Sequence, residues 1–269
     1  MRNLIKPMAT CLFLFISFFC YAQELPPIKN YAPEDYNAEY QNWSISQGEN
    51  KFIYVANNSG LLEFNGSQWK LHPSPNDTFV RAVKVIGERI YSGFFREFGF
   101  WLRNDLGQLE YNSLSKSLKD PMHEDEHIWN IVSFDKWVLF QSLHRIYVYN
   151  TNDKTFNIIQ SETLIPKVFI VGNGIYFQKM EEGVFKLENG QPKLLSDNEL
   201  FKNEILVSVF QNDNSVLFLT QEKGFYFLDN NEVYKWDISA NEILSTISVF
   251  SSLKLKNDEF VLGTISNGI

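Results

Sequence analysis

The chain of 269 residues carries 24 Lys and Arg against 32 Asp and Glu, a formal charge of −8, and 44% of its residues are hydrophobic. This composition excludes a disordered or fibrous chain. The acidic balance argues against nucleic-acid binding, which relies on clustered Lys and Arg. Aromatic residues are abundant, with 24 Phe, 12 Tyr and 6 Trp, and this favours β-strands.

Residues 1–22 have the pattern of a secretory signal peptide. Arg2 and Lys6 give a basic start, residues 8–19 form an apolar run, and cleavage is expected between Ala22 and Gln23. The run is too short for a stable membrane span, although a retained signal that anchors the chain stays open. We therefore expect export across the inner membrane and a periplasmic location. Both cysteines lie in this segment, so the mature chain is expected to contain no disulfide.

Residues 23–41 are expected to form a lead-in segment, and a repeat of about 40 residues occupies 42–269. Each unit has an apolar strand, a turn, a second apolar strand, a polar link and a third strand rich in aromatics. A glycine begins the third strand in phase, at Gly60, Gly99, Gly183, Gly224 and Gly268, with Arg145 in its place in the third unit. A fourth, more polar strand follows in each complete unit.

Four antiparallel strands every 40 residues indicate a β-propeller blade. We predict an all-β fold, a β-propeller of four-stranded antiparallel blades, with five complete blades and a sixth cut short inside its third strand. A sandwich of irregular strands is the alternative. The first strands are predicted at 42–45, 80–86, 128–134, 167–171, 205–210 and 247–253, and the fourth strands at 68–72, 108–112, 155–159, 192–195 and 232–236. The abrupt end indicates the front part of a longer protein.

One motif, His123-Glu124-Asp125-Glu126-His127, fits the H-E-x-x-H pattern of zinc proteases. That chemistry requires both histidines on one face of a helix, but this run follows Pro121 and precedes a strand without any helical period. We interpret it as a solvated loop. The carboxylate pairs Asp125-Glu126 and Glu181-Glu182 are likewise expected to be solvated, and the Tyr and Trp residues to be core. No catalytic residue, cofactor or metal site is predicted.

In a four-stranded blade, the link between the second and third strands shares a face with the connector to the next blade. That rim carries mixed polar groups, and a ligand is expected there if one binds. The candidate ligand-facing residues are Asn57, Asn58, Arg96, Glu97, Gln141, His144, Lys179, Gln221 and Asn267. Ordinary solvated loops are the alternative for each of them.

The segments 57–69 (NNSGLLEFNGSQW) and 91–101 (YSGFFREFGFW), with 126–131, 139–143 and 262–269, resemble the bacterial two-component-regulator propeller family. The similarity extends from about Tyr36 to the end. It implies an extracytoplasmic sensor, normally followed by a triple-tyrosine domain, a transmembrane helix and a LuxR-type helix-turn-helix or histidine kinase. Those parts would lie beyond these residues. The family offers no catalytic motif to transfer.

We therefore expect a sensor propeller of a membrane-spanning regulator that controls transcription. The expected partner is an unknown small molecule or saccharide signal, with a homodimer left open, no nucleic acid bound by this segment, and membrane contact only through other parts. A secreted or periplasmic propeller enzyme acting on polysaccharide is the first alternative. It would require carboxylates converging on the central channel. A non-catalytic envelope scaffold is the second.

Overall fold

The computed structural model describes residues 28–188, 190–212, 215–230 and 232–268. The chain divides into two compact units, Met1–Ala32 and Pro33–Ile269. In the first unit, the described residues 28–32 form no helix or strand, and the Lys29 ammonium lies 4.7 Å from the ring centroid of Tyr31. The predicted cleavage site, Ala22 and Gln23, lies outside the described residues. The paragraphs below concern the second unit.

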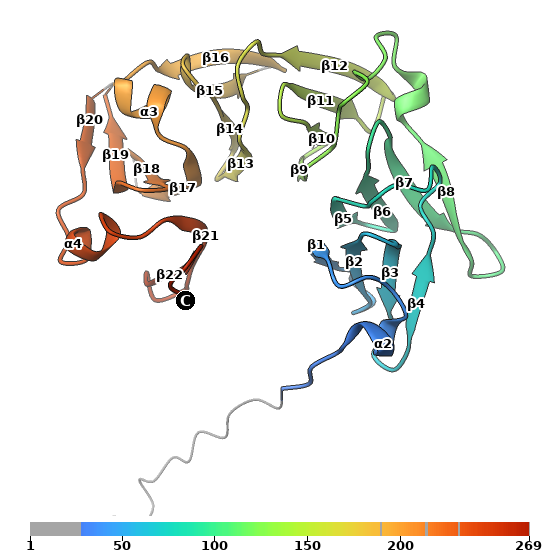
Figure 1. The fold of residues 1–269 in the computed structure, drawn as a ribbon. Coiled ribbons are helices and arrows are strands. Elements are labelled where there is room, and N and C mark those ends of the chain that lie inside the picture. Colours follow the sequence, from blue (N-terminus) through green and yellow to red (C-terminus); the bar gives the residue numbers. More distant parts are fainter. Residues whose placement is uncertain (1–27, 189, 213–214, 231, 269) are drawn as a thin grey trace, which may run out of the picture. The chain divides into compact units, whose positions relative to one another are not determined.

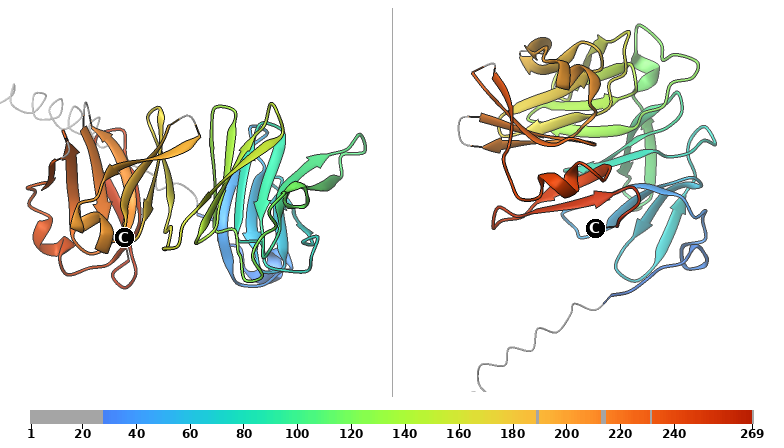
Figure 2. Two further views of the ribbon diagram at one scale, coloured as in Figure 1. Left: turned by 90° about the horizontal axis from the view of Figure 1, so that it is seen from above. Right: turned by 60° about the vertical axis from the view of Figure 1, so that its left-hand side comes forward.

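Five four-stranded antiparallel sheets and one two-stranded sheet follow one another in chain order (Figures 1 and 2). The first two sheets consist of β1 (Asn42–Gln47), β2 (Ile53–Asn57), β3 (Gly60–Phe64), β4 (Trp69–His72), β5 (Ala82–Ile86), β6 (Arg89–Gly93), β7 (Phe98–Arg103) and β8 (Leu109–Ser113). The third and fourth consist of β9 (Asn130–Phe134), β10 (Trp137–Gln141), β11 (Arg145–Asn150), β12 (Thr155–Gln160), β13 (Val168–Val171), β14 (Gly174–Lys179), β15 (Gly183–Glu188) and β16 (Gln191–Ser196). The last two consist of β17 (Leu206–Asn212), β18 (Ser215–Thr220), β19 (Gly224–Asp229), β20 (Glu232–Lys235), β21 (Val249–Lys254) and β22 (Phe260–Thr264). Short helices lie between strands: α2 (Pro33–Tyr36), η1 (Ser115–Ser117), α3 (Glu199–Asn203) and α4 (Asn241–Leu244).

The first strands of neighbouring sheets pack against one another along the whole series, from β1 and β5 to β17 and β21. At the first of these contacts, the backbone N–H groups of Val83 and Val85 donate to the Ser44 and Ser46 hydroxyls at 2.8 and 3.0 Å. Sequential four-stranded sheets that meet through their first strands form a β-propeller. The predicted fold class is confirmed.

The sixth sheet is incomplete within the described residues. Its described strands are β21 and β22 only. The Thr264 N–H donates to the Gly268 carbonyl at 2.9 Å, and in the fifth sheet Thr220 pairs with Gly224 where β19 begins. Gly268 therefore holds the opening position of a third strand, and Ile269 lies outside the described residues.

Aromatic side chains fill the space between neighbouring sheets. Phe98 of the second sheet packs against Phe140 and Tyr147 of the third, with ring centroids 4.4 and 5.0 Å apart. Phe201 and Phe218 make the same kind of contact farther along the chain, at 4.8 Å. Each such ring buries on the order of 150–250 Å², which explains how a chain rich in Phe and Tyr stacks its sheets.

Steric crowding explains why glycine recurs at the start of the third strand. Gly60 and Gly183 adopt φ values of +145° and +129°, and a Cβ on either would collide with the backbone carbonyl at the end of the neighbouring fourth strand, that of His72 or Ser196. An L-amino acid with a side chain is disfavoured at such a φ even without the collision. The third sheet has Arg145 instead, buried at the start of β11.

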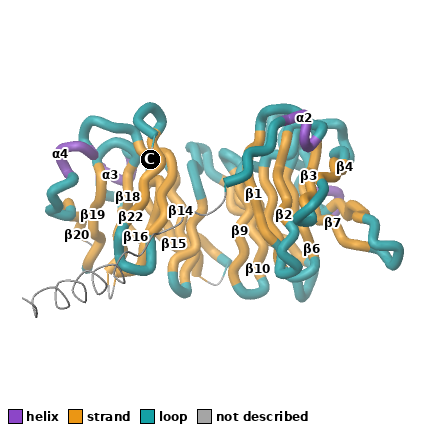
Figure 3. The backbone as a smooth tube through the Cα atoms, turned by 90° about the horizontal axis from the view of Figure 1, so that it is seen from below, coloured by secondary structure: helices purple, strands orange, loops and turns teal. Residues whose placement is uncertain are grey.

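Each sheet has two ends, seen as teal loops on either side of the orange strands in Figure 3. At one end, the links between second and third strands bond to the connectors between sheets: Ser161 N–H to the His144 carbonyl and Gln221 N–H to the Ile205 carbonyl, both at 2.9 Å. We call this end the connector face. The opposite end carries the turns within each hairpin pair and is called the hairpin face. Within the described residues, no helix is both long enough and apolar enough to cross a membrane.

Candidate ligand-binding site

Three consecutive sheets place an arginine between two tryptophans on the connector face. Trp43 lies at the start of β1, and Arg81 and Trp129 immediately precede β5 and β9. The Arg81 guanidinium carbon lies 3.9 Å from the Trp43 ring centroid and 4.8 Å from that of Trp129. The two indole rings are 6.0 Å apart and nearly perpendicular, at 78°. We call these residues the Trp–Arg–Trp cluster.

Backbone pairing fixes the cluster. The Arg81 N–H donates to the Gly93 carbonyl at 2.9 Å and the Trp129 N–H to the Gln141 carbonyl at 2.8 Å. Each residue thus continues its innermost strand by one step, although the regular strand begins one residue later. The Trp43 indole N–H donates to Asn58 Oδ1 at 2.8 Å, which orients the ring from the neighbouring link.

Arg81 is a cation without a carboxylate partner within the described residues. Its Nε is buried and makes no hydrogen bond, whereas its two terminal nitrogens are neither buried nor hydrogen-bonded to the described chain. Burial lowers the pKa of Arg81, because removal from water disfavours the charged form. The aromatic faces compensate part of that penalty through cation–π contacts, which leaves the terminal N–H groups available.

His127 borders the cluster. Its ring centroid lies 4.7 Å from that of Phe95 and 5.7 Å from that of Trp129, and its Nδ1 is buried without a hydrogen-bond partner among the described residues. Burial and the Arg81 charge lower the pKa of His127, and Asp125 opposes them. The imidazole is therefore neutral at pH 7, so Arg81 is the positive group of the cluster.

A pocket of about 130 Å³ adjoins Trp129 on the same face. Its base contains Arg145, whose guanidinium donates to the Pro121 carbonyl at 3.0 Å and to the Tyr147 hydroxyl at 3.3 Å, and contacts the His123 ring. Glu126 lies 3.9 Å from the same guanidinium. The pocket is lined by His123, Asp125, Glu126, His127, Trp129, Ser142, Leu143, His144 and Arg145.

Glu126 completes this buried network. It accepts hydrogen bonds from the Tyr147 hydroxyl at 2.8 Å and the Ser142 hydroxyl at 2.5 Å. Burial and the neighbouring Glu126 charge raise the pKa of Tyr147, so the phenol stays protonated and donates. The network fastens the connector before β9 to the third sheet.

The H-E-x-x-H segment is a loop with His123, Glu124 and Asp125 exposed, as expected from the sequence, but Glu126 departs from that expectation because it is buried. It forms no helix, and its two histidines point to different partners: His123 to Arg145, and His127 to the aromatic rings. Glu126 is only 8% exposed and lies 3.9 Å from the guanidinium of Arg145, the arginine that replaces the usual glycine and that also has the exposed Asp120 at 3.6 Å. No group of three or more potential metal ligands lies together in the described ranges.

Three of the nine predicted rim residues are buried and bonded within the fold, which differs from the expected solvent-facing placement. The Asn57 side chain donates to the Glu39 carbonyl at 2.7 Å, and the Gln141 side chain to the Ile165 carbonyl at 2.8 Å. Glu97 accepts from the hydroxyls of Tyr111, Ser113 and Ser115 at 3.0, 2.9 and 2.7 Å. These side chains hold connectors and cannot face a ligand without rearrangement.

The other six lie on the connector face without converging. Asn58 holds Trp43, His144 lines the pocket, and Arg96 is exposed on the link between the second and third strands of the second sheet. The remaining three belong to later sheets: Lys179, paired with Glu182 at 3.6 Å, Gln221 and Asn267. Their role as ligand contacts stays a prediction.

Sequence reasoning missed the cluster itself, because all tryptophans were assigned to the core. Trp43 and Trp129 are 40% and 37% exposed. The repeat contains a signal for it, because Trp43, Arg81 and Trp129 all stand at the start of the first strand in three consecutive units. The substitution of Arg145 for the phased glycine was a second signal, since it marked the sheet that holds the pocket.

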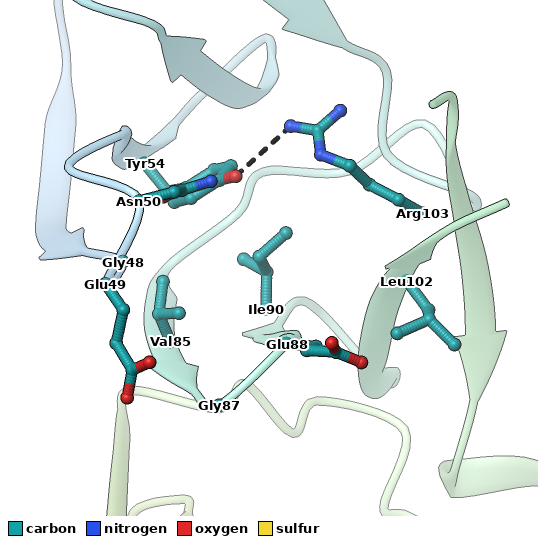
Figure 4. A pocket seen from close by; sticks show the side chains of 10 residues that line it. All are labelled: Gly48, Glu49, Asn50, Tyr54, Val85, Gly87, Glu88, Ile90, Leu102 and Arg103. Atoms are coloured by element: carbon teal, nitrogen blue, oxygen red, sulfur yellow. Dashed lines mark hydrogen bonds between the residues drawn. The ribbon is translucent and has the colours of Figure 1, made fainter. Parts of the chain in front are cut away.

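A larger concavity of about 470 Å³ lies on the hairpin face, between the first two sheets (Figure 4). Arg103 donates to the Tyr54 hydroxyl at 3.3 Å and to Glu63 at 2.7 Å. Its cation is therefore already paired, whereas Arg81 is not. The lining residues are Gly48, Glu49, Asn50, Tyr54, Val85, Gly87, Glu88, Ile90, Leu102 and Arg103.

Comparison with known proteins shows the fold. No protein-family model matches the chain, and no curated protein sequence matches it. The extracellular domain of BT4673 from B. thetaiotaomicron, described as a one-component system and as a hybrid two-component system, is similar at 15% identity and a TM-score of 0.58. The match covers 83% of this chain and 30% of that one, so this chain spans under a third of its length.

Two further structures are similar over most of their own length. YCF48 bound to a D1 peptide matches with a TM-score of 0.60 and 12% identity, covering 90% of this chain and 82% of that one. The WD40 β-propeller domain of Doa1 matches with a TM-score of 0.57 and 11% identity, covering 84% and 79%. At such identities the likeness establishes that the chain is a β-propeller.

Proposed function

We propose that this chain is the extracytoplasmic ligand-binding propeller of a membrane-spanning signal-transduction regulator that controls transcription. The observation that carries the proposal is the Trp–Arg–Trp cluster, where three sheets expose two indoles and a cation that has no carboxylate partner in the described part of the chain. Such a surface is suited to recognition. The motif resemblance to the two-component-regulator propeller family and the similarity to the extracellular BT4673 domain support the sensor role.

In this proposal a small molecule or saccharide binds the connector face in the periplasm. Because the cluster draws on three sheets, a ligand that contacts all three favours one relative arrangement of them, and differential affinity for two arrangements shifts their populations. Output would pass through a membrane span and a helix-turn-helix or kinase in the rest of the protein, with a homodimer as the candidate signalling assembly.

The test compares bacteria that carry the intact full-length protein with bacteria whose protein lacks residues 33–269. Both strains are exposed to a panel of purified saccharides, and their transcripts are sequenced. We expect one saccharide class to induce a set of genes in the intact strain only. Turnover of a glycan by the purified chain would instead establish the polysaccharide enzyme. Constant co-purification of one envelope protein without any transcriptional response would establish the scaffold.

A further inference from the structure

We propose that the Trp–Arg–Trp cluster binds a carboxylate-bearing saccharide, with the carboxylate on Arg81 and the sugar ring against Trp43 or Trp129. This inference rests on the proposed function, since it names the chemical class of the signal.

The first step concerns the charge. Arg81 has no ion-pair partner within the described residues, while its guanidinium carbon lies 3.9 Å from the Trp43 ring centroid and 4.8 Å from that of Trp129. A planar guanidinium with free terminal N–H groups matches a carboxylate with two parallel hydrogen bonds. Partial burial of the guanidinium disfavours its charge in the free protein, and an anion on the terminal N–H groups offsets part of that cost although the Nε stays unpaired.

The second step concerns the rings. Trp43 and Trp129 are each about two-fifths exposed, and Phe79, 43% exposed, lies with its ring centroid 5.4 Å from the Arg81 guanidinium carbon. The C–H face of a pyranose packs flat on an indole. Exposed aromatic surface beside a cation therefore suits a sugar ring whose negative charge is attached directly to the ring. A uronic acid has that arrangement, because its carboxylate is attached directly to the ring.

The third step concerns polar contacts around the ring. Asn58, His127 and His144 border the cluster or the adjoining pocket. Acidic peptides share the carboxylate but lack the flat C–H face, so the exposed indoles favour the saccharide.

The experiment measures binding of the purified full chain by isothermal titration calorimetry and tryptophan fluorescence at pH 7. The probes are trigalacturonic acid, its fully methyl-esterified form, and triglutamate. We expect the acid to bind at least tenfold more tightly than the ester and than triglutamate. Arg81→Met should reduce acid affinity at least tenfold and leave ester affinity unchanged, and Trp129→Ala should reduce affinity for both sugars.

The matched control is Arg89→Met. Arg89 is also half-buried, with its guanidinium carbon 4.6 Å from the Phe100 ring centroid, but it lies on the hairpin face. We expect no change in acid affinity for this variant, and near-ultraviolet circular dichroism checks that both variants fold. Arg81→Lys keeps the charge without the planar fork and should fall between wild type and Arg81→Met.

Equal affinity for acid and ester, equal affinity for triglutamate, or an unchanged affinity in Arg81→Met would each overturn the inference. Absence of binding by the acid would overturn it as well. None of these results touches the sensor proposal, because the transcript comparison uses saccharides of every class and is scored in the cell.

Discussion

The third and fourth sheets differ in the residue that begins their third strand, a position where the backbone of the fourth strand leaves little room for a side chain. In the fourth sheet, Gly183 begins the third strand with φ +129°, and the end of β16 passes so close that a Cβ would meet the Ser196 carbonyl. In the third, Arg145 occupies the equivalent place in β11 without a positive φ, and its side chain bonds to the connector that precedes β9. The departure from glycine therefore coincides with a built polar network and an adjoining pocket.

In a degenerate repeat, a position that departs from the shared residue indicates where a site can lie. Glycine at this position avoids the clash because it has no side chain, and it requires nothing of its neighbours. Arginine does, because a buried guanidinium must be neutralised and hydrogen-bonded by its surroundings. Glu126, Tyr147 and Pro121 supply those partners, and in doing so they place His127 and Trp129 at the cluster.

Arg145→Gly tests most directly whether the third sheet requires arginine where the fourth has glycine. If the repeat alone dictated the residue, glycine would be tolerated there. We expect instead a loss of about 3–5 kcal/mol in the free energy of unfolding, because Glu126 is left buried without its cation. Urea denaturation measures it. Arg96→Gly is the control: Arg96 is exposed with φ +54°, so glycine there should be neutral or slightly stabilising. Wild-type stability in Arg145→Gly would disprove the argument.

Gly183→Ala tests the other side of the comparison. The added Cβ collides with a backbone carbonyl at a φ that disfavours side chains, and we expect a loss of about 2–4 kcal/mol in unfolding free energy. Gly66→Ala is the matched control, since Gly66 has φ +95° but open space around it, and should lose only about 1–2 kcal/mol. Equal losses in both variants would show that φ strain acts without the collision.

Gln178→Met and Gln141→Met compare two buried glutamines that bond to connectors in the fourth and third sheets. Gln178 donates to the carbonyls of Phe201 and Glu204 at 2.7 and 2.6 Å and accepts from the Leu206 N–H at 2.9 Å. Gln141 donates in the same way, but its Oε1 has no partner in the described chain. We expect losses of about 2–3 kcal/mol for Gln178→Met and about 1–2 kcal/mol for Gln141→Met by thermal or urea unfolding. The reverse order would contradict this account.

The smallest expected effect is a pH dependence at Glu63, the buried carboxylate of the first sheet. Burial alone would raise its pKa, but hydrogen bonds from His72 and Arg103 outweigh burial and hold the pKa below the usual 4.5. The folded state thus binds the proton less well than the unfolded chain. The stabilisation is complete above pH 4.5 and is lost as pH falls through the folded pKa. The stability difference between wild type and Glu63→Gln should narrow on acidification from pH 7, and a widening difference would refute the assignment.

Most of the fold could be predicted from the sequence, because it follows from local periodicity. Alternating apolar strands, turn residues and the glycine phase specify the four-stranded sheets, and they depend on neighbours a few residues apart. The site depends on contacts between units. Ser142 and Glu126 are 16 residues apart, and Arg81 meets Trp43 and Trp129 across three sheets, so no single repeat contains the signal.

The errors at Asn57, Gln141 and Glu126 share a cause. Each is a polar residue in a segment that the sequence places outside the strands or at their ends, where solvation is the ordinary expectation. In the structure each satisfies backbone or side-chain groups of a connector that would otherwise be buried without a partner. Polarity alone does not distinguish a residue that faces water from one that replaces it.

The serine hydroxyls between β1 and β5 give the molecule an internal reporter. The amides of Val83 and Val85 lie on the edge strand of their own sheet, and their hydrogen bonds go to Ser44 and Ser46 of the neighbouring sheet. Deuterium uptake at these two amides, compared with uptake at amides bonded within each sheet, therefore distinguishes separation of adjacent blades from unravelling of either blade. Because the same bonds occupy groups that would otherwise be open to another strand, they also protect the inner edge against pairing with a foreign chain.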